Sequence, residues 1–180
     1  MSTKFFYALI LTICSIVLNL LLFFLGFQTE KLAIGQHLGW LGLVAMAVVL
    51  WLGIKTVREE AVDKSLSYGR GVGTGVLISL YSGLMNSVYT YIHFKFINPS
   101  FADYMMEIIR GKWAAAGMSE AQMERVEGFT RMMMGPGVQA VIAPIAAVFI
   151  GLILSLIFSA ILKRNPPPVV EEVPPVVPAA

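Results

Sequence analysis

The sequence has little charge and almost no cysteine. Of its 180 residues, 13 are Lys or Arg and 11 are Asp or Glu, which leaves a net charge of +2. A charge this small provides no basic surface for nucleic acid, so we expect no nucleic-acid partner. The single cysteine, Cys14, cannot form a disulfide within the chain and therefore says nothing about the redox compartment.

Motifs of the common enzyme classes are also missing. The sequence contains no P-loop, no Gly-x-Ser-x-Gly elbow, no His-Glu-x-x-His zinc motif and no pair of cysteines. A loose resemblance to a nucleotide-binding loop comes from Gly69, Gly71, Gly73 and Gly75. No strand precedes these glycines and no Lys-Ser or Lys-Thr pair follows them. We therefore expect a protein that is not an enzyme and has no cofactor.

What the chain does have is apolar residues, which make up 57% of it, with a mean hydropathy of +0.77. They are concentrated in four segments without Asp, Glu, Lys or Arg, at 5–27, 32–54, 71–94 and 138–162. A bilayer crossing needs about 20 apolar residues. The sequence predicts an all-α integral membrane protein with four transmembrane helices, one membrane domain over 1–164 and the lipid bilayer as its surroundings.

Basic residues predict the orientation of these spans. The connection between the second and third spans holds four of them, Lys55, Arg58, Lys64 and Arg70. Short loops rich in Lys and Arg stay on the cytoplasmic side. We therefore expect both termini in the cytoplasm, which agrees with Lys4 at the start and with Lys163 and Arg164 after the last span.

The third and fourth spans carry a small residue at every fourth position. The third has Gly71, Gly75, Ser79, Gly83 and Ser87, and the fourth has Ala143, Ala147, Gly151, Ser155 and Ser159. Small residues at this spacing let two membrane helices approach closely. We predict that the two stripes pack against each other. The alternative is that they form the contact between copies of the chain in a homo-oligomer.

The third span also contains the densest polar set of any apolar segment. We take Asn86, Tyr89, Thr90 and His93, with His37 at the start of the second span, as the candidate polar site. These side chains would suit the lining of a small channel. The two histidines, aided by an acid such as Asp103 or Glu107, would also suit a metal site.

A helical hairpin is predicted at 98–134, between the third and fourth spans. Asn98 and Pro99 are typical of a helix N-terminus, and Ser119 with Gln122 forms the pattern of a capping box. The hairpin is too short to have its own core, so we expect it to cover the outer end of the bundle. The proline-rich segment 165–180 is predicted to be a disordered tail.

The second half of the chain resembles a known family. The resemblance rests on three segments: Ser-Leu-Tyr-Ser-Gly-Leu at 79–84, Tyr-Thr-Tyr-Ile at 89–92 and Phe-Lys-Phe-Ile-Asn-Pro-Ser-Phe at 94–101. They are similar to the bacterial membrane family called domain of unknown function 4199, and the resemblance covers about 5–164. It implies a four-span protein with a helical insert before the last span, in a bacterial inner membrane. It implies no catalytic residues.

Three functions remain open from the sequence. The leading hypothesis is a non-enzymatic assembly or interaction subunit, with a homo-oligomer or a membrane protein as its partner. The second is a small oligomeric channel or facilitator, and the third is an intramembrane metal-dependent enzyme that uses the outer histidines. The absence of charged residues inside the spans disfavours ion-coupled transport, which usually needs ionisable groups in the membrane.

Overall fold

The computed structural model describes residues 1–166. The predicted tail therefore lies outside the described residues, except for its first two positions. The described chain is helical, with the elements α1 (Thr3–Phe24), α2 (Leu32–Gly35), the 3-10 turn η1 (Gln36–Gly39), α3 (Trp40–Glu59), α4 (Tyr68–Ile92), the π-helical turn η2 (His93–Ile97), α5 (Phe101–Ala115), α6 (Glu120–Met133) and α7 (Pro136–Leu162).

Three helical stretches within the described residues are long and apolar enough to cross a membrane. They are Thr3–Phe24, Leu32–Glu59 and Pro136–Leu162, and the second of them combines α2, η1 and α3. These stretches agree with three of the four predicted spans. The predicted third span is a 25-residue helix, α4, but it is not apolar enough to join the three. Its crossing of the membrane stays a prediction.

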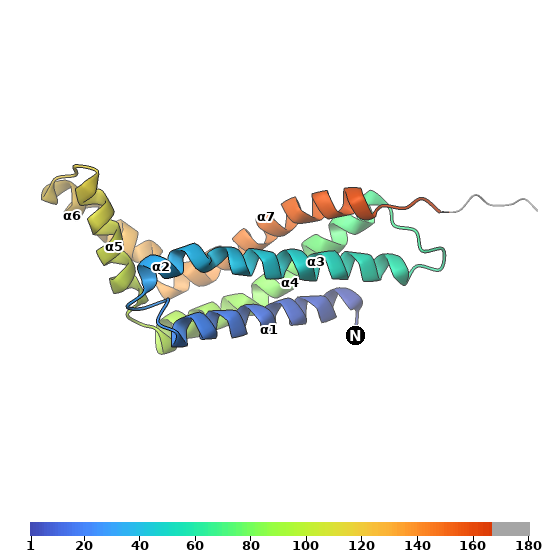
Figure 1. The fold of residues 1–180 in the computed structure, drawn as a ribbon, viewed down its shortest axis with the longest axis horizontal. Helices are drawn as coiled ribbons and strands as arrows, with labels where there is room; N and C mark the ends of the chain where they lie inside the picture. Colours follow the sequence, from blue (N-terminus) through green and yellow to red (C-terminus); the bar gives the residue numbers. More distant parts are fainter. Residues whose placement is uncertain (167–180) are drawn as a thin grey trace, which may run out of the picture.

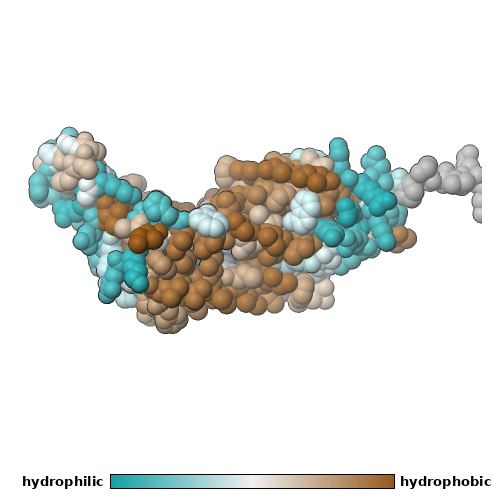
Figure 2. Space-filling view, viewed as in Figure 1, coloured by the Kyte–Doolittle hydropathy of each residue, from teal (hydrophilic) through white to brown (hydrophobic). Residues whose placement is uncertain are grey.

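The long helices form a bundle around α4, which contacts α1, α3 and α7 (Figure 1). The contact between α4 and α7 is the most extensive, and α3 also packs against α1 and α7. Helices α5 and α6 lie beyond one end of the bundle (Figure 1). Hydrophobic side chains cover the middle of the visible face, while hydrophilic ones gather at both ends (Figure 2). This distribution fits a protein whose middle lies in a membrane.

The loop between α3 and α4 is tied to the end of α7. Leu66 and Arg164 form an isolated antiparallel bridge, in which each backbone N–H donates to the other's carbonyl, at 2.9 and 3.0 Å. Helix α4 then begins after Ser67, whose hydroxyl accepts from the N–H of Arg70 at 3.4 Å. The side-chain cap satisfies one of the free N–H groups at the start of the helix.

The apolar core is fullest in the half of the bundle near this loop. Ala8, Leu50, Ile54 and Ile78 have no exposed surface at all. They come from α1, α3 and α4, so they fill the space between these helices at this end.

The start of α5 differs from the prediction. We expected Asn98 to cap the helix, but α5 begins at Phe101, after Ser100, which makes no side-chain cap. Asn98 is instead buried, and its Nδ2 donates to the carbonyl oxygen of Gln28 at 3.1 Å. The Asn98 side chain thus bonds to a loop that is distant in sequence instead of capping α5. A buried amide without a partner would cost more free energy than a helix N-terminus whose N–H groups are hydrated.

Helices α5 and α6 are joined by a turn at Gly117, which has a φ of +80°. The predicted capping box of α6 is confirmed: Ser119 accepts from the N–H of Gln122, and the Gln122 side chain accepts from the N–H of Ser119. Ion pairs join the two helices, with Arg110 bound to Glu127 at 3.1 Å and Arg131 bound to Asp103.

Candidate functional site

The two stripes of small residues lie in contact along α4 and α7. A Cβ added at Gly75 would lie 1.9 Å from the Ser155 Oγ, and one added at Gly151 would lie 1.9 Å from the Ser79 Oγ. The same pairing continues along the helices in both directions. Gly71 lies against Ser159 toward one end, and Gly83 lies against Ala147 and Pro144 toward the other. Beyond Gly83, the Ser87 hydroxyl donates to the carbonyl of Ala140 at 2.6 Å. Close approach of this kind leaves no space between α4 and α7.

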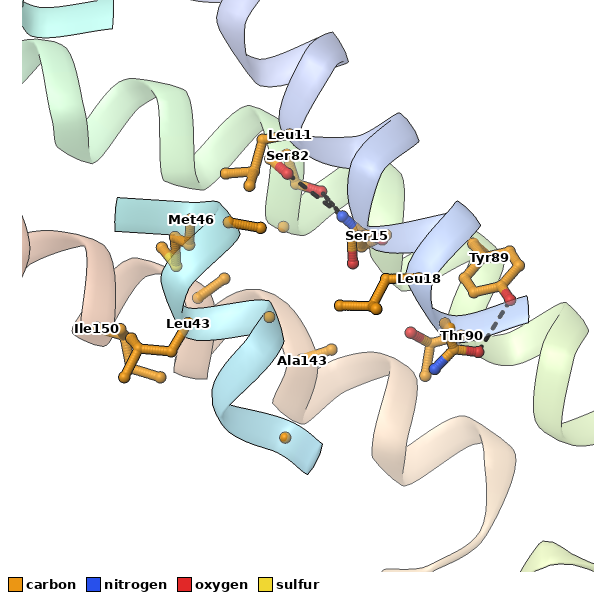
Figure 3. Close-up of a pocket in the computed structure, with 17 residues that line it drawn as sticks. Leu11, Ser15, Leu18, Leu43, Met46, Ser82, Tyr89, Thr90, Ala143 and Ile150 are labelled. Atoms are coloured by element: carbon orange, nitrogen blue, oxygen red, sulfur yellow. Dashed lines mark hydrogen bonds between the residues drawn. The ribbon is translucent and has the colours of Figure 1, made fainter. Parts of the chain in front are cut away.

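A cavity of about 340 Å³ borders this contact, and Gly83 of α4 and Ala147 of α7 form part of its wall. It lies among α1, α3, α4 and α7, and most of its wall is apolar (Figure 3). The apolar lining includes Leu11, Leu18, Leu43, Met46 and Ile150. Cavities of this size that combine apolar walls with a few polar groups are typical ligand sites.

Three predicted site residues, Asn86, Tyr89 and Thr90, line this cavity together. Asn86 Nδ2 donates to the Ser82 carbonyl at 3.1 Å and to the Ser82 hydroxyl at 3.3 Å, while Tyr89 donates to Asn19 Oδ1 at 2.9 Å. The Thr90 hydroxyl and the Asn86 Oδ1 atom have no hydrogen-bond partner within residues 1–166. The cavity therefore presents polar atoms that are free to bind a guest.

His93 lies beside the cavity rather than in its wall. It is 1% exposed, and its Nε2 is 2.8 Å from Gln28 Oε1 while its Nδ1 is 3.1 Å from the Tyr89 hydroxyl. Gln28 Nε2 donates to the carbonyl of Asn19 at 3.1 Å, so Gln28 Oε1 is the acceptor and His93 Nε2 carries a hydrogen. With the hydrogen of His93 on Nε2, the single hydrogen of the Tyr89 hydroxyl serves either Asn19 Oδ1 or His93 Nδ1. These contacts join the end of α1 to the end of α4.

His37 does not join His93. It lies exposed in η1 and makes no side-chain hydrogen bond in the described part of the chain. Asp103, one of the two acids considered for a metal site, is instead bound to Arg131. Across residues 1–166, no group of three or more His, Cys, Asp or Glu side chains is placed to hold a metal ion. Of the five predicted polar residues, the structure thus groups four and separates His37.

Two titratable groups away from the bundle have shifted pKa values. Hydrogen bonds from Ser65 lower the pKa of Asp63 in the loop between α3 and α4. The hydrogen bond to Asp103 raises the pKa of Arg131 in α6. Both groups are exposed and neither borders the cavity, so they serve local structure rather than the candidate site.

Sequence reasoning missed Gln28 and Ser15 as parts of the site. Gln28 is buried and contacts His93, although its place between two apolar segments predicts only a turn. Ser15 is a polar residue of the first apolar segment, and it lines the cavity. The contact of Asn19 with a neighbouring helix, which its polar amide in an apolar span predicts, is present as the bond from Tyr89.

A comparison with protein families finds one match. The family model described as "Protein of unknown function (DUF4199)" matches residues 6–164, which is nearly the whole described chain. No curated protein and no solved structure matches the chain.

Proposed function

The chain belongs to the DUF4199 family, and we propose that it is a non-enzymatic membrane protein that acts as an assembly or interaction subunit. The observation that carries this proposal is an uncovered apolar face on α6. Phe129 is 64% exposed, Met132 is 56% exposed and Val126 is 37% exposed. They share one side of the helix by their spacing of three residues. An apolar face of this kind on a helix outside the bundle is typical of a binding surface.

Charge favours a protein partner over a lipid surface for this face. Between 98 and 134 the chain has four basic residues, Arg110, Lys112, Arg125 and Arg131, and five acidic ones, Asp103, Glu107, Glu120, Glu124 and Glu127. Helices that lie on membranes usually present an excess of Lys and Arg to anionic lipid headgroups. Because basic and acidic residues are nearly equal in number here, an apolar protein surface suits the α6 face better than anionic lipid does.

The proposal is tested by purification in a gentle detergent followed by native mass spectrometry. We expect a second polypeptide in fixed stoichiometry, and its loss in Phe129→Ser, because this change removes the centre of the α6 face. Val62→Ser is the matched control, since Val62 is fully exposed in the loop at the opposite end of the bundle. A chain that elutes alone in the native state, or a partner that Phe129→Ser retains, contradicts the proposal.

We also propose that the protein lies in a bacterial inner membrane with four spans and both termini in the cytoplasm. Support comes from the charges at the bundle end that holds the start of α1 and the end of α7. Seven basic residues lie there, Lys4, Lys55, Arg58, Lys64, Arg70, Lys163 and Arg164, against three acidic ones, Glu59, Glu60 and Asp63. An excess of Lys and Arg in short segments favours the cytoplasmic side.

A fourth span at α4 is supported by where its polar residues lie. Thr74, Ser79 and Asn86 each donate to a carbonyl four residues earlier in α4. Leu84 and Val88, in contrast, are apolar and are 54% and 64% exposed. Thr74, Ser79 and Asn86 therefore lower the hydropathy of α4 while bonding to its own carbonyls, which is one way that polar residues are tolerated in membranes.

A small channel or facilitator is the second candidate, and the cavity is the observation that favours it. Asn86, Tyr89 and Thr90 would line a polar path. The path ends inside one chain, however, because Leu50 and Ile78 fill the bundle beyond the cavity with no exposed surface. Flux into liposomes that Asn86→Leu abolishes would establish the channel, and the absence of flux for small neutral solutes would remove it.

A further inference from the structure

The cavity among α1, α3, α4 and α7 has the size and chemistry of a small-molecule site. We propose that it binds one uncharged, mostly apolar molecule of about ten to fifteen non-hydrogen atoms that carries a hydroxyl or carbonyl group. A dry cavity of about 150 Å³ holds one benzene molecule. The volume here, about 340 Å³, is roughly twice that, and this ratio sets the size of the guest.

The lining residues define the polarity of the guest. Among residues 1–166, no Asp, Glu, Lys, Arg or His lines the cavity, so a charged molecule would lose its hydration without gaining a partner from these residues. Ser15, Asn86 and Thr90 line the same space. The hydroxyls of Ser15 and Thr90 and the Oδ1 atom of Asn86 make no hydrogen bond within residues 1–166. A single hydroxyl or carbonyl group on the guest would satisfy one or more of these atoms.

Access to the cavity is from the apolar surroundings of the bundle. Leu43 and Ile150 line the cavity and also reach the outer surface, with exposed fractions of 46% and 38%. Both side chains lie at one edge of the site, on α3 and α7 (Figure 3). Fully buried Leu50 and Ile78 close the bundle toward one end, and the bond between Tyr89 and Asn19 spans α4 and α1 toward the other. The guest therefore enters sideways from the membrane.

Glycine keeps the space open on the side of α3. Gly42 lines the cavity, and a Cβ added to it would meet no atom within 4 Å. Gly42→Leu therefore adds a side chain at the wall of the cavity whose Cβ is free of contacts, and we expect this side chain to occupy part of the space. Gly73 on α4 is also free of neighbours within 4 Å but does not line the cavity. Gly73→Leu is therefore a matched control with the same change of residue.

The experiment uses the purified full-length chain in lipid nanodiscs and a photoreactive probe, an eight-carbon alcohol that carries a diazirine. Adducts are mapped by mass spectrometry at Leu18 and Met46 in the cavity, and at Val17 and Val88 on the outer surface as an internal reference for partition into lipid. We expect excess 1-octanol to reduce the cavity adducts about tenfold without changing the outer ones. Gly42→Leu should remove the cavity adducts, and Gly73→Leu should retain them.

The polar part of the proposal is tested by the double variant Ser15→Ala with Thr90→Val. It should weaken competition by 1-octanol about tenfold, the change expected for one lost hydrogen bond, and leave competition by n-octane unchanged. Absence of cavity adducts, which a lipid acyl chain held in the site would produce, overturns the proposal. So do cavity adducts that octanol does not reduce. Even if Gly42→Leu does not purify as a single species, competition between the probe and 1-octanol on the native chain still tests whether the cavity binds the alcohol.

Discussion

Gly75 marks one of the two closest approaches between α4 and α7, the other being Gly151 against Ser79. A Cβ at this position would lie 1.9 Å from the Ser155 Oγ and 2.8 Å from the Ser155 Cβ. Gly75→Leu should therefore separate the two helices and lower the free energy of unfolding by about 1–3 kcal/mol. Thermal unfolding in one detergent measures the effect, which corresponds to roughly 2–4 °C per kcal/mol for a chain of this length. Gly73→Leu, whose side chain enters open space, should not show the loss. Equal unfolding midpoints for the two variants would contradict the close packing.

The contact between His93 and Gln28 joins residues 65 positions apart. Gln28→Met leaves His93 Nε2 buried without its acceptor, and His93→Phe leaves Gln28 Oε1 without its donor. Each change should cost about 1–3 kcal/mol of stability, because an unpaired buried polar group loses its hydration.

The double variant of Gln28 and His93 should cost less than the sum of the two single changes, since it removes both partners of one bond. The cycle is measured by thermal unfolding of the four proteins under one set of conditions. Strict additivity would show that the two side chains do not stabilise each other.

Prediction from sequence worked at residues where one local rule decides the outcome. The four-residue spacing of small side chains favours close helix packing whatever the partner, and Gly75 does lie against Ser155 in α7. Gln28 was beyond such reasoning, because its role depends on a loop and a helix end that meet only in the folded chain. The prediction that Asn98 caps α5 was wrong for a related reason, because its side chain bonds to the distant carbonyl of Gln28 instead. No spacing rule relates His37 to His93, and the structure keeps them apart.

At the scale of elements, α5 and α6 begin in different ways. Ser119 caps α6 through a complete capping box, whereas Ser100 makes no side-chain bond at the start of α5. Ser119→Ala should destabilise α6 by about 1 kcal/mol, and Ser100→Ala should have little effect on α5. Hydrogen exchange of the first-turn amides measures both. Faster exchange in both helices, or in neither, would contradict the difference between the caps.

The elements also show why the sequence predicts the helices better than it predicts the site. Long apolar runs define α1, α3 and α7, and this signal does not depend on how the helices pack. The cavity, in contrast, is a property of the space that four helices leave between them. Its polar residues on α4 were found because they lie in one run of sequence, while Ser15 on α1 becomes part of the site only through packing.

At the scale of the whole molecule, four spans place the α3–α4 loop and the segment between α4 and α7 on opposite sides of the membrane. The α3–α4 loop contains Val62, and the turn between α5 and α6 contains Met118. If α4 crosses the bilayer, Val62 and Met118 lie on opposite sides, and the proposed orientation places Val62 in the cytoplasm. If α4 does not cross, both residues lie on the same side.

Single cysteines test this arrangement in intact cells, in a Cys14→Ala background that removes the native thiol. A membrane-impermeant maleimide should label Met118→Cys directly, and should label Val62→Cys only after the membrane is permeabilised. Labelling of both cysteines in intact cells, or of neither, would show that α4 does not span. Labelling of Val62→Cys alone would keep four spans but reverse their orientation. In that case the excess of basic residues at the bundle end with the start of α1 and the end of α7 would not set the topology of this chain.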